Sequence, residues 1–212
     1  TAATRSMLRF GGGLTVKNLF VFASRNMDNL IVARMLGAAA TGFYTRAFNL
    51  TRIPQMRVVG IVYQVSFPAF CRLRDDEERF RAMFETASRL IALIVAPILL
   101  GIAAVADDFT IAVLGPQWAG MIVPLQLLAV AALVNCLHAL AGAAIEATGK
   151  VSYEILTQGA YAALIIAGTV AGTRWGVEGV SYAVVGAAVV FYLLKAVTIR
   201  LAVGISTARF VT

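Results

Sequence analysis

Charged and reactive side chains are scarce in this sequence. Only 14% of its 212 residues are charged, and it has one histidine and two cysteines. Soluble domains carry about 25% charged residues, so the composition excludes an ordinary soluble fold. Cys71 and Cys136 lie far apart without CxxC spacing, which predicts free thiols rather than a disulfide or metal site. GxSxG, HExxH, Walker A and DxD motifs do not occur, so we expect no enzyme activity, cofactor or metal.

Apolar residues make up 60% of the chain, and the mean hydropathy is +0.83. A helix needs about 20 mostly apolar residues to cross a bilayer, and several segments reach that length. Because such segments are too long for strands, we predict an all-α integral membrane protein with one six-helix transmembrane domain over residues 1–212. The approximate spans are 10–35, 41–70, 86–106, 121–144, 151–171 and 180–203.

Basic residues predict the orientation of these spans. The net charge is +7, and Lys and Arg accumulate on cytoplasmic connections of membrane proteins. With both ends cytoplasmic, Arg72–Arg81, Lys150 and Arg200 lie inside, while Trp118 and Trp175 lie at the outer interface. The basic charge then reflects topology, and we expect no nucleic-acid partner. The chain begins with Thr and ends without an obvious stop, so we expect a piece of a longer protein.

The charged stretch before span 86–106 predicts the start of a helix. Asp75 and Asp76 suit the positive N-terminal end of that helix. Glu85 and Arg89 have the i,i+4 spacing of a salt bridge. We interpret this stretch as a solvated cytoplasmic turn of helix.

Polar residues interrupt the first span in the stretch SRNMDNLIVARMLG, residues 24–37. Asn18, Phe22, Arg25 and Asn29 follow i, i+4, i+7, i+11 spacing, which predicts one face of a helix. Asp28 lies three residues from Arg25 and is predicted to pair with it. Lys17 flanks this group.

The second, fourth and fifth spans also carry polar side chains. The second holds Arg46, Asn49, Arg52 and Arg57, with a kink predicted at Pro54; the later spans hold Asn135, His138, Glu146, Glu154, Gln158 and Tyr161. Two interpretations are open: interhelical hydrogen bonds and salt bridges, or a functional cavity. We predict structural pairing in the later spans, where the charges roughly balance. Asp28, His138, Glu146 and Glu154 are the candidates for ion coupling.

The first two spans carry more positive charge than their single acid, Asp28, can balance. Lipid does not solvate such charges, which predicts a cationic, water-filled cavity for an anionic ligand. Phosphate, pyrophosphate or an acidic sugar fits, because the guanidinium fork binds phosphate oxygens bidentately. The candidate substrate-binding residues are Lys17, Asn18, Arg25, Asn29, Arg46, Asn49, Arg52 and Arg57.

The stretches FGGGLTVKNLFVFASRNMDNLIVARMLG, FPAFCRLRDDEERFR, VLGPQWAG and ALAGAAIEATGK resemble the second half of bacterial polysaccharide transporters. These are the lipopolysaccharide, exopolysaccharide and O-antigen flippases of the MATE-like MOP superfamily. The resemblance implies two six-helix lobes around a central cavity and export of a polyprenyl-pyrophosphate-linked oligosaccharide across the bacterial inner membrane. It implies that the first helix of this lobe lines the cavity, where Arg25 and Asn29 match, and that an N-terminal lobe is missing here.

The implied partners are a lipid-linked oligosaccharide, membrane lipids, the missing lobe and the glycan polymerase machinery. Three alternatives remain open at this point: a multidrug or other lipid exporter of the same superfamily, a membrane-embedded glycan polymerase or ligase, and a structural half without a transport role. A drug exporter for cations would need an acidic cavity, and a polymerase or ligase would need a large extracytoplasmic loop, which the sequence does not show.

Overall fold

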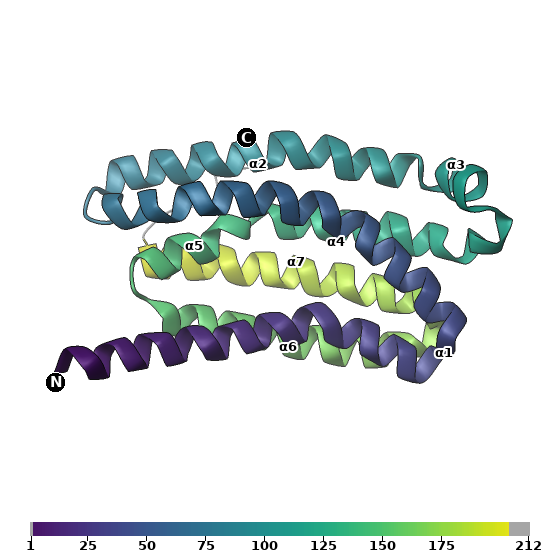
Figure 1. The fold of residues 1–212 in the computed structure, drawn as a ribbon, viewed down its shortest axis with the longest axis horizontal. Coiled ribbons are helices and arrows are strands. Elements are labelled where there is room, and N and C mark those ends of the chain that lie inside the picture. The colour runs from purple at the N-terminus through teal and green to yellow at the C-terminus, as the bar shows by residue number, and fades with distance from the viewer. Residues whose placement is uncertain (1, 204–212) are drawn as a thin grey trace.

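The computed structural model describes residues 2–203, and this part of the chain is helical apart from short turns between the helices (Figure 1). The α-helices are α1 (Ala2–Leu73), α2 (Glu77–Ala104), α3 (Ala106–Phe109), α4 (Ile122–Leu137), α5 (Ala139–Ala147), α6 (Val151–Gly172) and α7 (Gly176–Val203). Three short elements join them: the π-helix η1 (Thr110–Leu114) and the 3₁₀-helices η2 (Pro116–Met121) and η3 (Thr173–Trp175). The predicted all-α class is confirmed.

Helix α1 turns back on itself at Gly37, between the segments predicted as separate spans. Gly37 has φ 82° and ψ −176°, a conformation that is essentially restricted to glycine. The two arms of α1 meet at this bend and diverge from it (Figure 1), and near the bend the Tyr44 hydroxyl of the second arm donates to Asp28 of the first at 2.8 Å. The backbone keeps helical angles through Pro54, so the predicted kink there does not break the helix.

Within residues 2–203, three helical stretches are long and apolar enough to cross a membrane. They are Glu77–Ala104, Pro116–Ala147 and Val151–Leu201, with mean hydropathy of 2.2, 2.0 and 2.0 over their most apolar windows. Large apolar side chains on these stretches face outward, for example Leu93 at 75% exposure and Leu156 at 73%. Such surfaces suit a lipid solvent, and the chain is a multi-pass membrane protein.

Helices α6 and α7 pack closely beside their connection. A Cβ atom built on Gly172 would lie 2.6 Å from the carbonyl oxygen of Gly179, so only glycine allows the two backbones to approach this far. Small residues permit such close helix pairs in membranes. The close approach fixes α6 against α7, and so fixes Glu154 of α6 relative to Lys195 of α7.

The start of α2 matches the sequence prediction in part. The Asp76 side chain accepts a hydrogen bond from the Arg79 backbone N–H at 3.1 Å, the N-cap role expected of an aspartate before a helix. Glu85 pairs with Arg81 at 3.1 Å instead of with Arg89, so the predicted Glu85–Arg89 bridge is wrong. Both arginines are one turn from Glu85, and the side chain meets the one on its N-terminal side.

Candidate functional site

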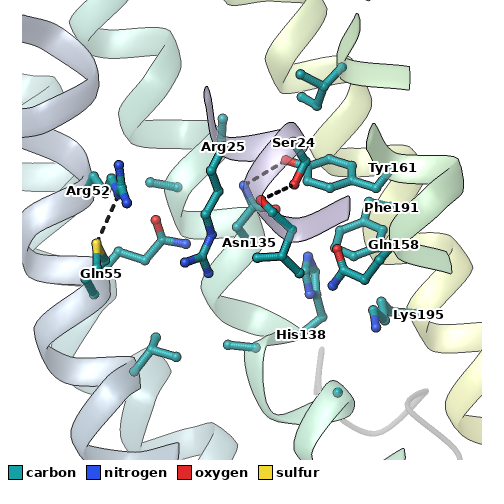
Figure 2. Close-up of a pocket in the computed structure, with 18 of the residues that line it drawn as sticks. Ser24, Arg25, Arg52, Gln55, Asn135, His138, Gln158, Tyr161, Phe191 and Lys195 are labelled. Carbon is teal, nitrogen blue, oxygen red and sulfur yellow. Dashed lines mark hydrogen bonds between the residues drawn. The ribbon is translucent and has the colours of Figure 1, made fainter. Parts of the chain in front are cut away.

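A cavity of about 540 Å³ lies among both arms of α1 and helices α4, α5, α6 and α7 (Figure 2). This volume is within the range of about 300–1,000 Å³ that is typical of ligand pockets. The charged side chains that line it are Lys17, Arg25, Asp28, Arg52, Glu146, Glu154 and Lys195. These are four cations and three anions, which leaves a surplus of one positive charge.

Arg25 and Arg52 are the two arginines of this cavity. Figure 2 shows Arg25 reaching into the pocket, between Gln55 on one side and Asn135 and His138 on the other. The Arg52 Nε donates to the Met56 sulfur at 3.0 Å. Among the side chains that the structure describes, no carboxylate lies within salt-bridge distance of either guanidinium. Two cationic groups therefore face the same space with their charge uncompensated.

Asp28 is not the partner of Arg25, and this prediction is wrong. Its carboxylate is 1% exposed and accepts hydrogen bonds from the Tyr44 hydroxyl and the Asn29 backbone N–H, each at 2.8 Å. The bend at Gly37 brings Tyr44 opposite Asp28, a contact that depends on the tertiary fold and that helical spacing alone does not reveal. Asp28 thus joins the two arms of α1.

The first ion pair of the cavity joins Lys17 to Glu146. The Lys17 Nζ lies 2.8 Å from Glu146 Oε1, with the two side chains 15% and 8% exposed. The Tyr63 hydroxyl donates to the other carboxylate oxygen at 3.1 Å. These contacts tie both arms of α1 to the end of α5, so the positive charge of Lys17 is already balanced within the protein.

The second ion pair joins Lys195 to Glu154 and is almost completely buried. The side chains are 2% and 3% exposed, and Gln158 also donates to Glu154, at 3.3 Å. Gly142 of α5 leaves room for this carboxylate, since a Cβ there would lie 2.9 Å from Glu154 Oε1. Glu154 is thus paired as predicted for the later spans, but its partner Lys195 lies on the sixth span, outside the predicted set.

Lys195 is the main cavity residue that the sequence prediction missed. The signal was present in the sequence, because α6 and α7 form an antiparallel hairpin around η3. Glu154 stands 20 residues before Arg174 and Lys195 stands 21 residues after it. Opposite charges at nearly equal distances from a helical turn are expected to meet.

His138 occupies the junction between α4 and α5. Its ring meets Phe191 edge-on, with centroids 4.7 Å apart, and its Nε2 is buried without a hydrogen-bond partner in the described structure. Asn135, one turn earlier, donates to the Tyr161 hydroxyl at 3.5 Å. His138 is therefore packed among aromatic rings, as a structural role requires, and it also borders the cavity.

Four of the predicted substrate-binding residues lie outside the cavity lining: Asn29, Arg46, Asn49 and Arg57. Asn29 accepts a hydrogen bond from Thr45 at 2.9 Å and so joins the arms of α1. Arg46 lies over the Trp118 ring, 5.5 Å from its centroid.

Helical geometry explains why Arg57 and Asn49 lie outside the cavity lining. Arg57 is five residues beyond Arg52 and therefore about 140° away around the helix. Asn49 is exposed, and Phe48 and Thr51 form the lining at its level.

The other predicted residues lie together in the structure. Lys17, Asn18, Arg25, Arg52, Asp28, His138, Glu146 and Glu154 all border this one cavity. On the first arm of α1 the lining face consists of Lys17, Asn18, Val21, Ser24, Arg25 and Asp28, so it is turned slightly from the predicted stripe. No group of three His, Cys, Asp or Glu side chains that could hold a metal occurs within the described residues.

Comparison with known proteins identifies the family. A family model described as "Polysaccharide biosynthesis protein" matches residues 1–123, more than half of the chain. The lipopolysaccharide biosynthesis protein WzxC of Escherichia coli K12 is 34% identical over 150 residues, which are 71% of this chain and 30% of that protein.

Two further relatives come from other bacteria. The teichuronic acid biosynthesis protein TuaB of Bacillus subtilis is 30% identical over 125 residues, 59% of this chain and 26% of TuaB. The succinoglycan biosynthesis transport protein ExoT of Rhizobium meliloti is 27% identical over 114 residues, 54% of this chain and 23% of ExoT. The chain thus spans between about a quarter and a third of these relatives.

The fold matches that of a solved structure. A MOP superfamily transporter from Pyrococcus furiosus aligns with a TM-score of 0.69 over 94% of this chain and 45% of that chain, at 19% sequence identity. Identity this low supports the fold alone. Because the family model covers more than half of its length, the chain belongs to the polysaccharide biosynthesis protein family, and it has the fold of a MOP superfamily transporter.

Proposed function

We propose that this chain is one lobe of a flippase that moves an oligosaccharide linked to polyprenyl pyrophosphate across the bacterial inner membrane. The glycan would serve lipopolysaccharide, capsule or exopolysaccharide synthesis. The observation that carries the proposal is the pair Arg25 and Arg52, which face one intramembrane cavity without a carboxylate partner. Guanidinium groups bind phosphate oxygens bidentately, and an uncompensated charge at this depth calls for an anionic ligand. Relatives named for lipopolysaccharide biosynthesis and succinoglycan transport support the cargo class.

The proposed architecture is a six-helix lobe in a two-lobe transporter. The six spans are the two arms of α1, α2, α4 together with α5, α6 and α7. The solved transporter is about twice as long as the segment matched by this chain, which supports a second lobe of similar size. We assign this chain as the C-terminal lobe, with both of its ends in the cytoplasm.

In the proposed mechanism, the arginines without a carboxylate partner and the ion-paired residues of the cavity have different roles. Arg25 and Arg52 bind the pyrophosphate, while the lipid tail stays in the bilayer and the lobes rock around the site. Lys17 stands eight residues before Arg25, about 12 Å along the helix, so the Lys17–Glu146 pair lies toward the cytoplasmic end.

The ion-coupling role belongs to the carboxylates of the two ion pairs. Glu146 and Glu154 border the cavity and have basic partners that they can exchange during transport. Asp28 and His138 are further candidates, although Asp28 is held by Tyr44 and Asn29 rather than by Arg25.

An export assay with the full-length protein in a flippase-null strain tests this function. Arg25→Gln and Arg52→Gln are expected to reduce surface glycan at normal protein abundance. Arg57→Gln is the matched control, because Arg57 lies on the same helix but outside the cavity. Full export by the Arg25→Gln/Arg52→Gln double variant would contradict the proposal.

The main alternative is an exporter of cationic drugs, which requires an acidic cavity. The positive surplus of the cavity speaks against it. Competition by anionic rather than cationic compounds is the expected result, and inhibition by cations alone would favour the drug exporter.

A further inference from the structure

A second, smaller cavity of about 110 Å³ lies between α2 and α7, beside the junction of α4 and α5. A single buried water needs only about 10–15 Å³, so this space accommodates a larger group. Its lining is mostly apolar, and its basic members are Arg89, His138 and Lys195. No acidic side chain among the described residues borders it. The charge of the lining therefore favours a ligand that is anionic at one end and apolar at the other.

Arg89 supplies the uncompensated charge of this second cavity. Its side chain is exposed, and the acid one turn before it, Glu85, is bound to Arg81 at 3.1 Å. No described carboxylate lies within salt-bridge distance of Arg89. Lys195, in contrast, is balanced by its buried pair with Glu154. An anion that enters this cavity would thus meet the Arg89 guanidinium.

The position of Arg89 along α2 places it at the edge of the hydrocarbon layer. Residues 90–106 contain no charged side chain and span about 26 Å of helix, close to the roughly 30 Å thickness of a bilayer core. Leu90 and Leu93 beside it are 47% and 75% exposed, so this part of α2 faces lipid. The guanidinium consequently lies at the level of the phospholipid phosphates.

We propose that the second cavity binds the head group of an anionic phospholipid from the surrounding membrane. Arg89 binds the phosphate, the Ser88 hydroxyl lies beside it in the lining, and the acyl chains lie along the exposed apolar surface of α2. A zwitterionic lipid fits less well, because no acid in the lining receives its ammonium group. This site is separate from the proposed cargo site and does not depend on it.

His138 lies between this second cavity and the larger cavity of about 540 Å³. Its side chain borders both cavities, and its Nε2 is buried without a partner in the described part of the chain. A lipid bound beside Arg89 would therefore contact a residue of the wall that separates it from the cargo path.

Native mass spectrometry of the full-length protein in detergent tests the proposal with phosphatidylglycerol and phosphatidylcholine of identical chains. We expect phosphatidylglycerol to bind more tightly, and Arg89→Gln to weaken it about five- to tenfold. Arg89→Lys keeps the charge and is expected to retain part of the affinity. Arg72→Gln removes another exposed arginine, outside both cavities, and serves as the control that should leave binding unchanged.

A second variant tests whether lipid binding requires the cavity itself or only an exposed arginine at the lipid surface. Ala92→Leu fills the cavity from α2 without changing charge, and we expect it to weaken phosphatidylglycerol as much as Arg89→Gln does. Equal binding of the two lipids, or unchanged binding in both Arg89→Gln and Ala92→Leu, would overturn the proposal. Displacement of the lipid by millimolar inorganic phosphate would also overturn it and identify a phosphate-ion site.

Discussion

Replacing Lys195 with methionine is expected to destabilise the protein strongly. Methionine has a similar length and apolar stem, so the change mainly removes the charge that balances Glu154. The two side chains are 2% and 3% exposed, and water therefore cannot replace the lost partner. Glu154 would keep only the hydrogen bond from Gln158 at 3.3 Å.

The expected loss in free energy of unfolding follows from the burial of this ion pair. Removing one member of a buried ion pair costs about 3–5 kcal/mol, because the other charge remains desolvated and unpaired. Arg81→Met is the matched control, since its pair with Glu85 is 39% and 25% exposed and is worth about 0–1 kcal/mol. Reversible unfolding of the full-length protein in mixed micelles, followed by tryptophan fluorescence, measures both free energies.

The double variant Lys195→Met/Glu154→Gln completes the experiment. Because it leaves no buried charge, it is expected to recover the larger part of the lost stability. The reasoning is refuted if Lys195→Met costs no more than Arg81→Met, or if the double variant is less stable than Lys195→Met alone.

Three glycine positions give further predictions, each measured as a free energy of unfolding. Gly142→Ala should cost about 1–3 kcal/mol, because its Cβ would lie 2.9 Å from the Glu154 carboxylate, whereas Gly186→Ala, with open space, should cost nothing. Gly37→Ala should cost about 1–3 kcal/mol through its φ of 82°. Gly172→Ala should cost at least as much as Gly142→Ala, since backbone rather than a side chain blocks its Cβ. Equal stability of the Gly142→Ala and Gly186→Ala proteins would contradict the packing described for α5.

The sequence was sufficient for the fold class and for much of the cavity. Apolar length predicts the long helices, and of the predicted stripe on the first arm Asn18 and Arg25 line the cavity, whereas Phe22 and Asn29 do not. On the second arm, the surplus of positive charge rather than helical spacing indicates Arg52, and it indicates Arg46 and Arg57 equally, although these two lie outside the cavity lining. These predictions succeed because helical periodicity is local and because charges in an apolar helix stand out.

Partners across helices could not be predicted with the same rules. Asp28 is bound by Tyr44 because Gly37 reverses the chain, and local spacing assigned it to Arg25 instead. A count of charges over the first two spans leaves Lys17 unpaired, yet Glu146 balances it from more than a hundred residues away. The cavity is therefore less positive than a count of charges along α1 suggests.

The most direct test of the central claim is the affinity of the full-length protein for undecaprenyl pyrophosphate in nanodiscs. Each lost charge-assisted contact is expected to weaken binding about tenfold or more, so Arg25→Gln/Arg52→Gln should lose about a hundredfold. Arg57→Gln should bind within about twofold of the wild type, because its side chain lies outside the cavity. Unchanged affinity in the double variant would contradict the claim that these two arginines form the anion-binding site.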